Sequence, residues 1–592
     1  MCGIAGILGR DTNRVNRDAL RRMVGLMKHR GPDDEGFWTG GSWGIGHCRL
    51  SIIDSKRGKQ PMGNEDGTVW VVFNGEIYNH AELRSRLTER GHIFKTKCDT
   101  EVLVHLFEEY GSGCVDHLNG MFALCIIDTV HRTAFLARDR FGIKPLYYSC
   151  NSDGLVFASE IRALVDGYGI GRDMNPEAVL DHFTFQYTLG DKTWFKGVSM
   201  LEPGHYGMFK DGCLSIRQYW DFQFAPEDMD EKTALDRLDE AFSRSLKRHL
   251  MSDVPLGSYL SGGNDSSAIC LYAKKHVENL KTFTCGFSFP RHYRDERCVD
   301  ERPFARESAE FLNTSHHELN LTSEDIIGSI DSVSRYLEEP MAGISYQIYL
   351  LSEFVSRHIR VVLVGVGGDE LFAGYPWRYE TINPEDDYDA FRDNYYSVWS
   401  RIVPSEERDS FFSPEFLKAT GGYSPKDAFF EIMDRCNSPN YIEKAHYYEI
   451  KTFLRALLFV EDKLSMAHSI ESRVPFLDNE IVDIVCQMPL HIRYNRREIK
   501  HMLLKLLKRH LPDKLLQGRK LGFTPPDATW FRMDNRNFLM SSMNGNLSRL
   551  GMFQGKKIDT YLNEFLSGCT DRRFLFWSLL MTEKILHNSA DK

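Results

Sequence analysis

The sequence predicts an α/β protein with two unlike halves, and three observations support this. Up to about residue 205, short β-like runs broken by glycines, such as 43–54 and 69–79, predict layered sheets. From about residue 229, apolar strands such as 281–286 and 361–365 alternate with helical stretches, which is typical of a parallel sheet. Beyond about residue 385 the pattern is mostly helical, so we expect the sheet to end there.

Composition and charge exclude several classes of protein. A chain of 592 residues is long enough for at least two domains. Its net charge of -10 argues against a nucleic-acid partner, which would require a basic face. No segment resembles an export signal, and no apolar run reaches the ~20 residues that cross a bilayer. The 13 cysteines are scattered without a CxxC pair, so we expect reduced thiols, a cytoplasmic location and no membrane partner.

A cysteine stands at the second position of the chain, and small and aliphatic residues follow it. Cys2 could simply begin a buried strand. It could also become an N-terminal nucleophile after removal of Met1, with its own α-amine as the base. An α-amine has a pKa near ~8, so it can accept a proton near neutral pH. Taken alone, these residues favour the buried strand.

Residues 254–270 predict a phosphate-binding loop between a strand and a helix. The strand ends at Leu260, and the loop and helix start that follow contain Ser261, Gly262, Gly263, Asp265 and Ser266. Glycines let backbone N–H groups approach an anion, and a helix N-terminus adds positive potential. A carboxylate in such a loop cannot bind phosphate directly, so we expect it to hold Mg²⁺. The alternative is a glycine-rich turn with a serine cap, which the full S-G-G-x-D-S pattern disfavours.

A second strand, loop and helix, at 360–375, carries Asp369 just after the strand. Parallel sheets bind ligands at the carboxyl ends of their strands. We therefore expect Asp265 and Asp369 to face one magnesium pyrophosphate.

The motifs of both halves resemble a single family. "MCGIAGI", "HRGPDDEG", "FNGEIYN" and "RDRFGIKPLYY" resemble the class II glutamine amidotransferase domain of glutamine-dependent asparagine synthetases. The phosphate loop resembles that of the ATP pyrophosphatases, and "LSMAHSIESRVPFLDNEIVD" and "GRKLGFTPPDATW" resemble the synthetase signatures. The resemblance implies an Ntn-hydrolase αββα sandwich at 2–205, a connection at 206–228 and a parallel-sheet ATP-pyrophosphatase domain with a largely helical end at 229–592.

For the first domain, the resemblance implies a glutaminase. Cys2 would attack the side-chain amide of glutamine, form a glutamyl thioester and release ammonia. Asn74 and the backbone N–H of Gly75 would stabilise the oxyanion. Arg49 would bind the α-carboxylate of glutamine. Asp99, together with Glu76, would bind its α-amine.

For the second domain, the resemblance implies that ATP adenylates a carboxylate, by family default aspartate. Ammonia would arrive through an internal tunnel and form the amide, with release of AMP and pyrophosphate. Lys520 would contact the α-phosphate, and Mg²⁺ would be held by Asp265 and Asp369. The ATP contacts that we expect are Leu260, Ser261, Gly262, Gly263, Asp265, Ser266, Gly286, Gly365 and Gly367. The partners are then glutamine, ATP and a small carboxylate acceptor, with a homodimer left open.

The sequence departs from the family around the acceptor. Val366 stands where the family has a glutamate, Asn264 replaces a leucine, and Tyr346 and Gln347 replace small and aliphatic residues. Valine cannot accept a proton or bind an ammonium group. One hypothesis is therefore a different acceptor, such as a sugar uronate or a natural-product carboxylate. The other is that aspartate remains the substrate and Glu370 or a water supplies the proton path; we weigh the two equally.

Three further interpretations are less favoured. An amino-sugar or phosphoribosylamine transferase would lack the loop at 261–267, and a non-catalytic scaffold would not need Cys2, Asp265 and Lys520. The "SHHEL" stretch at 315–319 suggests zinc, but a histidine pair without a third ligand more often marks a strand end.

Overall fold

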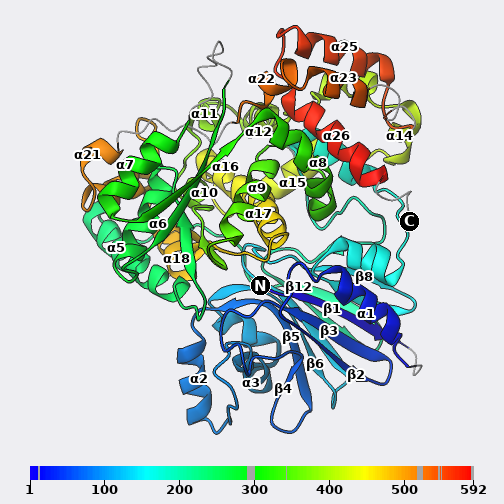
Figure 1. Ribbon diagram of the computed structural model, residues 1–592, viewed down its shortest axis with the longest axis vertical. Helices are drawn as coiled ribbons and strands as arrows, with labels where there is room; N and C mark the ends of the chain where they lie inside the picture. The colour runs from blue at the N-terminus through cyan, green and yellow to red at the C-terminus, as the bar shows by residue number, and fades with distance from the viewer. Residues whose placement is uncertain are drawn as a thin grey trace.

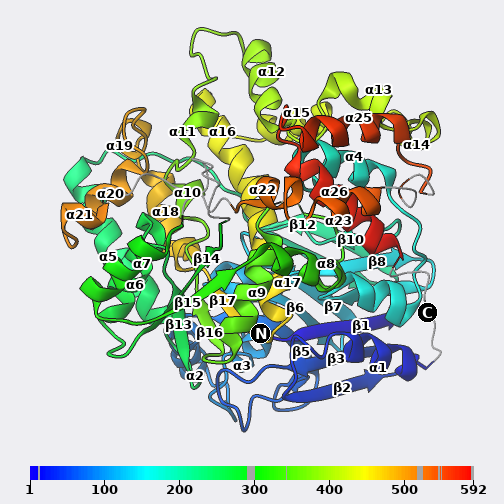
Figure 2. The same cartoon turned by 45° about the horizontal axis from the view of Figure 1, so that its top comes forward.

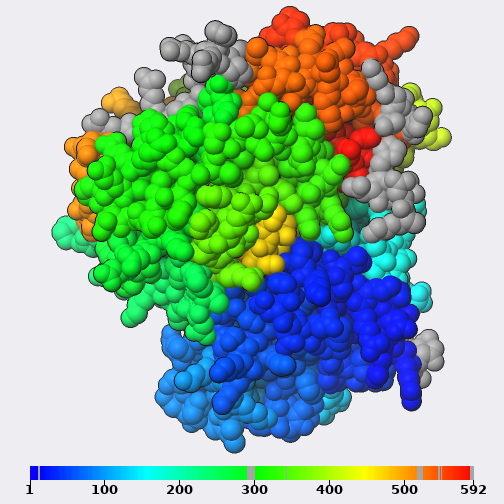
Figure 3. All heavy atoms as spheres, viewed as in Figure 1, coloured from blue at the N-terminus to red at the C-terminus, as the bar shows by residue number. Residues whose placement is uncertain are grey.

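The computed structural model describes residues 1–10, 14–289, 300–341, 343–516, 525–543, 547 and 550–587. Figure 1 shows the N-terminal half, in blue and cyan, below the C-terminal half, in green to red. The space-filling view shows these halves in direct contact over a broad boundary (Figure 3). Lys520 lies outside the described residues.

Two six-stranded antiparallel sheets form the N-terminal half. The first has the strand order β10-β8-β9-β1-β3-β2 and the second β12-β11-β7-β6-β5-β4. The strands of the first sheet are β1 (Gly3–Gly9), β2 (Asp34–Gly40), β3 (Trp43–Arg49), β8 (Tyr147–Asn151), β9 (Gly154–Ala158) and β10 (Ser199–Met200). Those of the second are β4 (Met62–Gly63), β5 (Val69–Ile77), β6 (Gly120–Asp128), β7 (Thr133–Arg138), β11 (His205–Lys210) and β12 (Cys213–Gln218).

Helices cover the outer faces of both sheets. Helix α1 (Arg17–Leu26) packs on β1 and β3, and α3 (Glu101–Tyr110) packs on β4 and β5 beside α2 (His80–Glu89). Between the sheets, Ile4, Ile45 and Val72 belong to one buried apolar cluster. The layers thus run helix, sheet, sheet, helix, which confirms the αββα sandwich. The half also contains η1 (Gly111–His117), η2 (Ala163–Tyr168) and α4 (Pro176–Phe185).

The second sheet of the N-terminal half continues beyond residue 205, where the sequence suggested that the first domain ends. Strands β11 and β12 pair as a hairpin, and β11 also pairs with β7. The turn between them uses Gly212 at φ +76°, in the left-handed region that favours glycine. The stretch that we expected to be a connection therefore partly forms an edge of this sheet, because Gly212 allows the hairpin turn.

A five-stranded parallel sheet forms the centre of the C-terminal half, with the order β15-β14-β13-β16-β17. Its strands are β13 (Leu256–Tyr259), β14 (Lys281–Phe287), β15 (Ser315–Leu321), β16 (Val361–Leu363) and β17 (Glu471–Arg473). Because β13 pairs in parallel with both β14 and β16, the loops after these strands meet at one edge. The expected parallel sheet is confirmed.

Helices make up most of the remainder of this half. Around the sheet, α6 and α7 pack on β13 to β15, α9 packs on β14 and β15, and α17 packs on β17 (Figure 2). The helices before residue 385 are α5 (Glu231–His249), α6 (Asn264–Lys274), α7 (Arg302–Leu312), α8 (Ser323–Leu337), α9 (Ser345–Ser356), α10 (Gly368–Leu371) and α11 (Pro376–Tyr379).

Beyond residue 385 the chain is largely helical, as expected. Its helices are α12 (Tyr388–Trp399), α13 (Arg408–Phe411), α14 (Pro414–Ala419), α15 (Pro425–Asp434), α16 (Tyr441–Tyr448), α17 (Arg455–Met466), α18 (Asn479–Gln487), α19 (Leu490–Arg493), α20 (His501–Lys508), α21 (Asp513–Leu516), α22 (Asp527–Arg532), α23 (Arg536–Met543), α25 (Gly555–Leu566) and α26 (Arg573–His587). Short η3 (Ser405–Glu407), η4 (Glu449–Leu454) and η5 (Pro475–Leu477) lie among them. Throughout the described ranges, every helix is too short or too polar to cross a membrane.

Candidate functional site

The first site surrounds Cys2, which directly precedes β1 at the centre of its sheet. The Cys2 side chain is buried, and burial raises the pKa of its thiol. The Cys2 backbone N–H donates to Asn74 Oδ1 at 3.0 Å, and its carbonyl accepts from Arg30 Nε at 3.0 Å. Met1 is buried, and its amine pairs with Glu471 at 3.0 Å. The cysteine is therefore held on both sides of its backbone.

Asn74 and Gly75 lie on β5, beside Cys2. Asn74 Nδ2 is buried and has no hydrogen-bond partner among the described residues. A donor left in this state costs free energy unless a ligand accepts from it. A Cβ atom on Gly75 would come within 2.0 Å of the Met121 carbonyl on β6, so glycine allows the two strands to pair here. The pair thus offers an unused amide donor next to the thiol.

Three charged side chains enclose the same region. The Arg49 guanidinium donates to the carbonyls of Ile53, Asp54 and Ser55, which fixes its orientation. Asp99 accepts from the Ile77 N–H at 3.0 Å. Burial raises the pKa of Asp99, and burial together with the charges of Glu471 and Asp99 raises that of Glu76 well above its usual range. A bound ammonium group would relieve this strain, since it would stabilise the ionised carboxylates.

The second site is a cavity of about 570 Å³ at the carboxyl edge of the parallel sheet. The predicted residues that line it are Leu260, Ser261, Gly262, Gly263, Asp265, Ser266, Gly365 and Asp369. Gly286 and Gly367 are not among its lining residues. A Cβ atom on Gly286 would meet Arg302, and one on Gly367 would meet Leu477, so both glycines face packed protein.

Hydroxyl groups fix the shape of the phosphate loop. Ser266 Oγ accepts from the Ser261 N–H at 3.1 Å, and Ser261 Oγ accepts from the Gly263 N–H at 3.2 Å. Gly262 has φ +80°, and a Cβ atom there would come within 2.6 Å of the Phe304 backbone. The loop is therefore closed on itself before helix α6 begins at Asn264.

Lys500, which sequence reasoning missed, lies between the two aspartates. Its ammonium group bonds Asp265 and lies 2.8 Å from Asp369. Lys500 is buried, and the two carboxylates raise its pKa. The aspartates thus converge on one cationic group, a donor arrangement that also suits Mg²⁺. The signal in the sequence was weak, because Lys500 is one of several basic residues in the stretch 496–509 and no motif distinguishes it from the others.

The departures from the family pattern fall into two groups. Asn264, Gln347 and Val366 line the cavity, and the buried Gln347 amide makes no well-oriented hydrogen bond to the described residues. Tyr346 is buried behind the wall, where its hydroxyl donates to Asp527. Glu370 accepts from the Tyr375 hydroxyl at 2.6 Å and is not among the lining residues.

A second missed residue, Glu461 on α17, also lines the cavity. Its carboxylate accepts from Ser472 Oγ at 2.6 Å, and burial raises its pKa to about 7. The next residue, Asp462, instead bonds Arg30 at 2.7 Å and Lys144 at 3.1 Å in the N-terminal half. Two consecutive residues of α17 therefore contact the two sites: Glu461 lines the cavity, and Asp462 bonds Arg30, which donates to the Cys2 carbonyl.

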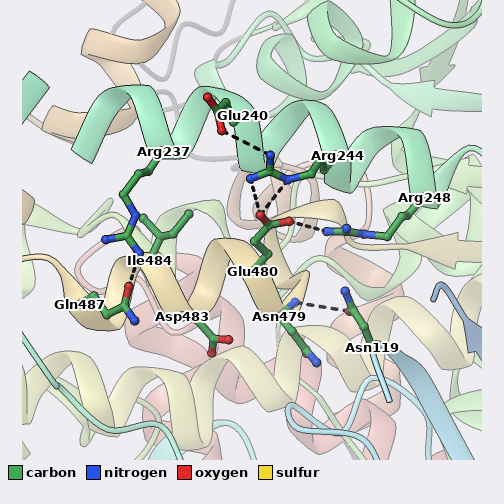
Figure 4. A pocket seen from close by; sticks show the side chains of 10 residues that line it. All are labelled: Asn119, Arg237, Glu240, Arg244, Arg248, Asn479, Glu480, Asp483, Ile484 and Gln487. Atoms are coloured by element: carbon green, nitrogen blue, oxygen red, sulfur yellow. Dashed lines mark hydrogen bonds and ion pairs between the residues drawn. The ribbon is translucent and has the colours of Figure 1, made fainter. Parts of the chain in front are cut away.

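A separate hollow of about 360 Å³ lies between α5 and α18 and contains no predicted site residue (Figure 4). Arg244 and Arg248 point toward Glu480 in this view, and Asn119, from the N-terminal half, accepts from the Asn479 N–H. These cations are already paired. The "SHHEL" histidines lie on β15, where His317 stacks on Phe283 with ring centroids 5.3 Å apart.

Comparisons with known proteins match both halves. Residues 1–220 match the family model described as a glutamine amidotransferase domain, and residues 237–587 match the one described as asparagine synthase. Asparagine synthetase [glutamine-hydrolyzing] 1 of Bacillus subtilis (strain 168) is 30% identical, covering 90% of this chain and 88% of its own. A putative asparagine synthetase [glutamine-hydrolyzing] of Mycobacterium tuberculosis (strain ATCC 25618 / H37Rv) is also 30% identical, over 98% of this chain and 94% of its own.

Two more distant similarities complete the comparison. Amidase chry2 of Gibberella zeae (strain ATCC MYA-4620 / CBS 123657 / FGSC 9075 / NRRL 31084 / PH-1) is 27% identical and covers 90% of each chain. Among solved structures, the glutamine phosphoribosylpyrophosphate amidotransferase of B. subtilis, complexed with ADP and GMP, is 18% identical with a TM-score of 0.29. It covers 46% of this chain and 64% of its own, too weak a likeness to support any conclusion.

Proposed function

The chain belongs to the glutamine-hydrolysing asparagine synthetase family, and we propose that it forms asparagine from aspartate, ATP and glutamine. It is an ATP-dependent carbon–nitrogen ligase with glutamine as the amide donor. We assign glutamine hydrolysis to residues 2–218, which include the β11–β12 hairpin, and amide formation to 229–592. The observation that supports the proposal is that consecutive residues of α17 reach both sites: Glu461 lines the cavity of the phosphate loop, and Asp462 pairs with Arg30, which donates to the Cys2 carbonyl.

Glutamine hydrolysis begins at Cys2 once Met1 has been removed. The α-amine of Cys2 then takes the thiol proton, and the thiolate attacks the amide carbon of glutamine. Asn74 Nδ2 and the Gly75 N–H donate to the oxyanion, ammonia leaves, and water hydrolyses the thioester to glutamate. Arg49 binds the glutamine α-carboxylate, and Asp99 with Glu76 binds its ammonium group. The raised pKa values of Asp99 and Glu76 support this role, since a cationic ligand would stabilise both carboxylates.

Amide formation occurs in the larger cavity. The loop from Ser261 to Ser266 holds the pyrophosphate part of ATP. The aspartate carboxylate attacks the α-phosphorus and pyrophosphate leaves, and ammonia then attacks the acyl carbon of the adenylate and displaces AMP to form the amide. Asp265 and Asp369 would hold Mg²⁺, which when bound neutralises charge on the phosphates. Lys500 keeps these two carboxylates together. We keep Lys520 as a contact of the α-phosphate, on the resemblance alone.

Ammonia would reach the adenylate through the interior, past Arg30 and α17. Glu461 lines the receiving cavity and supplies a carboxylate that Val366 cannot. It could bind the ammonium group of aspartate or accept a proton from attacking ammonia. We therefore favour aspartate over another acceptor. Glu370 is a poorer candidate for the proton path, since it is not among the residues that line the cavity.

Two substitutions test the separate sites. Cys2→Ala should abolish glutaminase activity and glutamine-driven amide formation while free ammonia still yields asparagine. Asp265→Asn should lose pyrophosphate release and retain glutaminase activity, because loss of a metal ligand costs several kcal/mol of transition-state stabilisation. Both assays use purified chain with aspartate, ATP and Mg²⁺, and with either glutamine or ammonia as the nitrogen source.

The controls decide between the parts of the proposal. Glutaminase activity that survives in Cys2→Ala would refute the nucleophile. Pyrophosphate release that requires a sugar uronate instead of aspartate would refute the acceptor while leaving the two-site chemistry intact.

A further inference from the structure

Two histidines and two glutamates from three separate segments meet on the N-terminal half, remote from Cys2 in the sequence. Glu65 follows β4, His92 follows α2, and His105 and Glu108 lie on α3. Figure 1 shows α2, α3 and β4 gathered at the bottom of the blue half. Within the described part of the chain, ligand atoms of Glu65, His92 and His105 all lie within 4.8 Å of one another. We propose that this His/Glu cluster is a structural site for a zinc-class divalent ion.

The distances inside the cluster suit one small ion. His92 Nδ1 and His105 Nδ1 are 3.1 Å apart, and Glu108 Oε2 lies 3.1 Å from the His105 Nδ1 and 3.6 Å from the His92 Nδ1. Glu65 Oε2 lies 3.6 Å from His105 Nδ1. In a tetrahedral site with metal–ligand bonds of about 2.0–2.2 Å, neighbouring ligand atoms are about 3.3–3.6 Å apart. Two of these four distances are slightly shorter than that range and two lie at its upper end.

In three of the four residues, the atom that faces away from the cluster is held by another group, as in metal sites whose ligands are oriented by a surrounding shell. The exception is His105, whose Nε2 is buried without a hydrogen-bond partner among the described residues. His92 Nε2 bonds Glu109 at 3.1 Å, which directs the lone pair of Nδ1 inward. Glu108 Oε1 accepts from Asn64 Nδ2 at 2.7 Å, and Glu65 Oε1 accepts from the Ile93 N–H at 3.3 Å. In each of these three residues, the bond to the outer group leaves the other ligand atom facing the cluster.

The chemistry of the cluster favours a transition ion over Mg²⁺ or Ca²⁺. Imidazole nitrogen suits zinc and its neighbours, whereas Mg²⁺ and Ca²⁺ prefer oxygen ligands alone. Glu65, His92 and His105 supply three ligand atoms, and Glu108 Oε2, 3.1 Å from His105 Nδ1, is placed to be a fourth. Four protein ligands would leave no open position, as in structural sites and not catalytic ones. The ion would tie the segment between α2 and α3, which carries Asp99, to the turn between β4 and β5.

Metal binding to the full-length chain tests the site without glutamine or ATP, so the result is independent of the proposed reaction. The chain is treated with chelator, dialysed and titrated with Co²⁺ alone. We expect one ion per chain and the visible absorption of tetrahedral Co²⁺, which Zn²⁺ then bleaches. Glu109→Gln should weaken Co²⁺ binding by about 10–100-fold, because it removes the partner that orients His92.

Three variants complete the experiment. His92→Gln should lose the absorption, and Glu65→Gln, at an exposed position, keeps the test valid if the histidine variant fails to fold. His131→Gln is the matched control, since His131 pairs with one carboxylate, Asp128, at 2.7 Å on the same half. It should bind Co²⁺ as the unaltered chain does. The proposal is overturned if the unaltered chain takes up no more Co²⁺ than Glu65→Gln. The cluster would then be a hydrogen-bonded pair of histidines and not a metal site.

Discussion

At the scale of single residues, three buried carboxylates lie where a cationic or reacting ligand would bind. Glu76 and Asp99 lie at the proposed glutaminase site, and Glu461 lines the cavity of the proposed synthetase site. Burial raises the pKa of each, because a carboxylate loses solvation in the interior. Structural acids can behave in the same way, so location decides the interpretation. A functional role for Glu461 is favoured because this residue lines the cavity.

The first residue-scale prediction concerns Glu461→Gln and pH. The Glu461 pKa is about 7, so the side chain is protonated below that pH and ionised above it. We compare the synthetase rate of the unaltered chain with that of Glu461→Gln at each pH. If the ionised carboxylate binds aspartate or accepts a proton from ammonia, the ratio of the first rate to the second should rise as pH increases through about 7. The ratio cancels the change in free ammonia with pH. A flat ratio between pH 6 and 8 would remove Glu461 from the reaction.

The pH dependence of the unfolding free energy provides an independent test of Glu461. The folded pKa of about 7 lies above the unfolded value of about 4.3, so the folded state holds the proton more tightly. The resulting stability is present below pH about 4.3 and is lost as pH rises to about 7. The unaltered chain should therefore lose unfolding free energy relative to Glu461→Gln across that window.

At the scale of elements, the phosphate loop depends on the short connection between β13 and α6. Parallel pairing brings this connection next to the loop that follows β16, so a carboxylate from each can bond Lys500. The connection can turn so tightly because Gly262 adopts a positive φ beside the Phe304 backbone. Loop shape, more than helix or strand propensity, therefore controls the second site.

Gly262→Ala tests this role of the loop. A methyl group would strain the positive φ and collide with the Phe304 backbone, so pyrophosphate release should fall while glutaminase activity persists. Gly328→Ala in α8 is the matched control, because a Cβ atom there meets no atom within 4 Å. It should leave both activities intact and stabilise the helix by roughly 0.5–1 kcal/mol. Equal pyrophosphate release by the two variants would contradict the argument.

At the scale of the whole molecule, buried ion pairs join the halves. Asp462 of α17 binds Arg30 and Lys144, and Arg30 also bonds Glu160 at 2.9 Å. These groups are almost fully buried. Breaking such a network leaves unpaired charges in the interior, which is costly. The halves should therefore remain docked, with Cys2 and the cavity in a fixed relation.

Asp462→Ala should uncouple the halves. Removing this carboxylate leaves Arg30 and Lys144 undercompensated, at a cost of about 3–5 kcal/mol. The first thermal unfolding transition should move to lower temperature, and more glutamate should form for each asparagine. Asp483→Ala is the control: Asp483 also pairs across the halves, with Arg140 at 3.2 Å, but its side chain is 55% exposed. Its loss should cost about 0–1 kcal/mol. Similar shifts for both variants would argue against the buried network.

The sequence by itself determined the fold class and the reaction class, because both reside in local patterns. Alternation of strands and helices predicted the parallel sheet, and the S-G-G-x-D-S stretch predicted the loop that now lines the cavity. Cys2, Asn74 and Gly75 could be named because a motif and its order along the chain carried them. The roles of these residues, and of Lys520 outside the described ranges, stay predictions.

Only the tertiary structure decided which distant side chains meet. Lys500 reaches Asp265 from 235 residues away, and Asp462 reaches Arg30 across 432 residues. No motif singled out Glu461, and Glu65, His92 and His105 had no metal-ligand spacing. The hairpin beyond residue 205 was likewise read as a connection. In each case the interaction depends on packing between elements, and a spacing pattern records only contacts within an element or its adjoining turn.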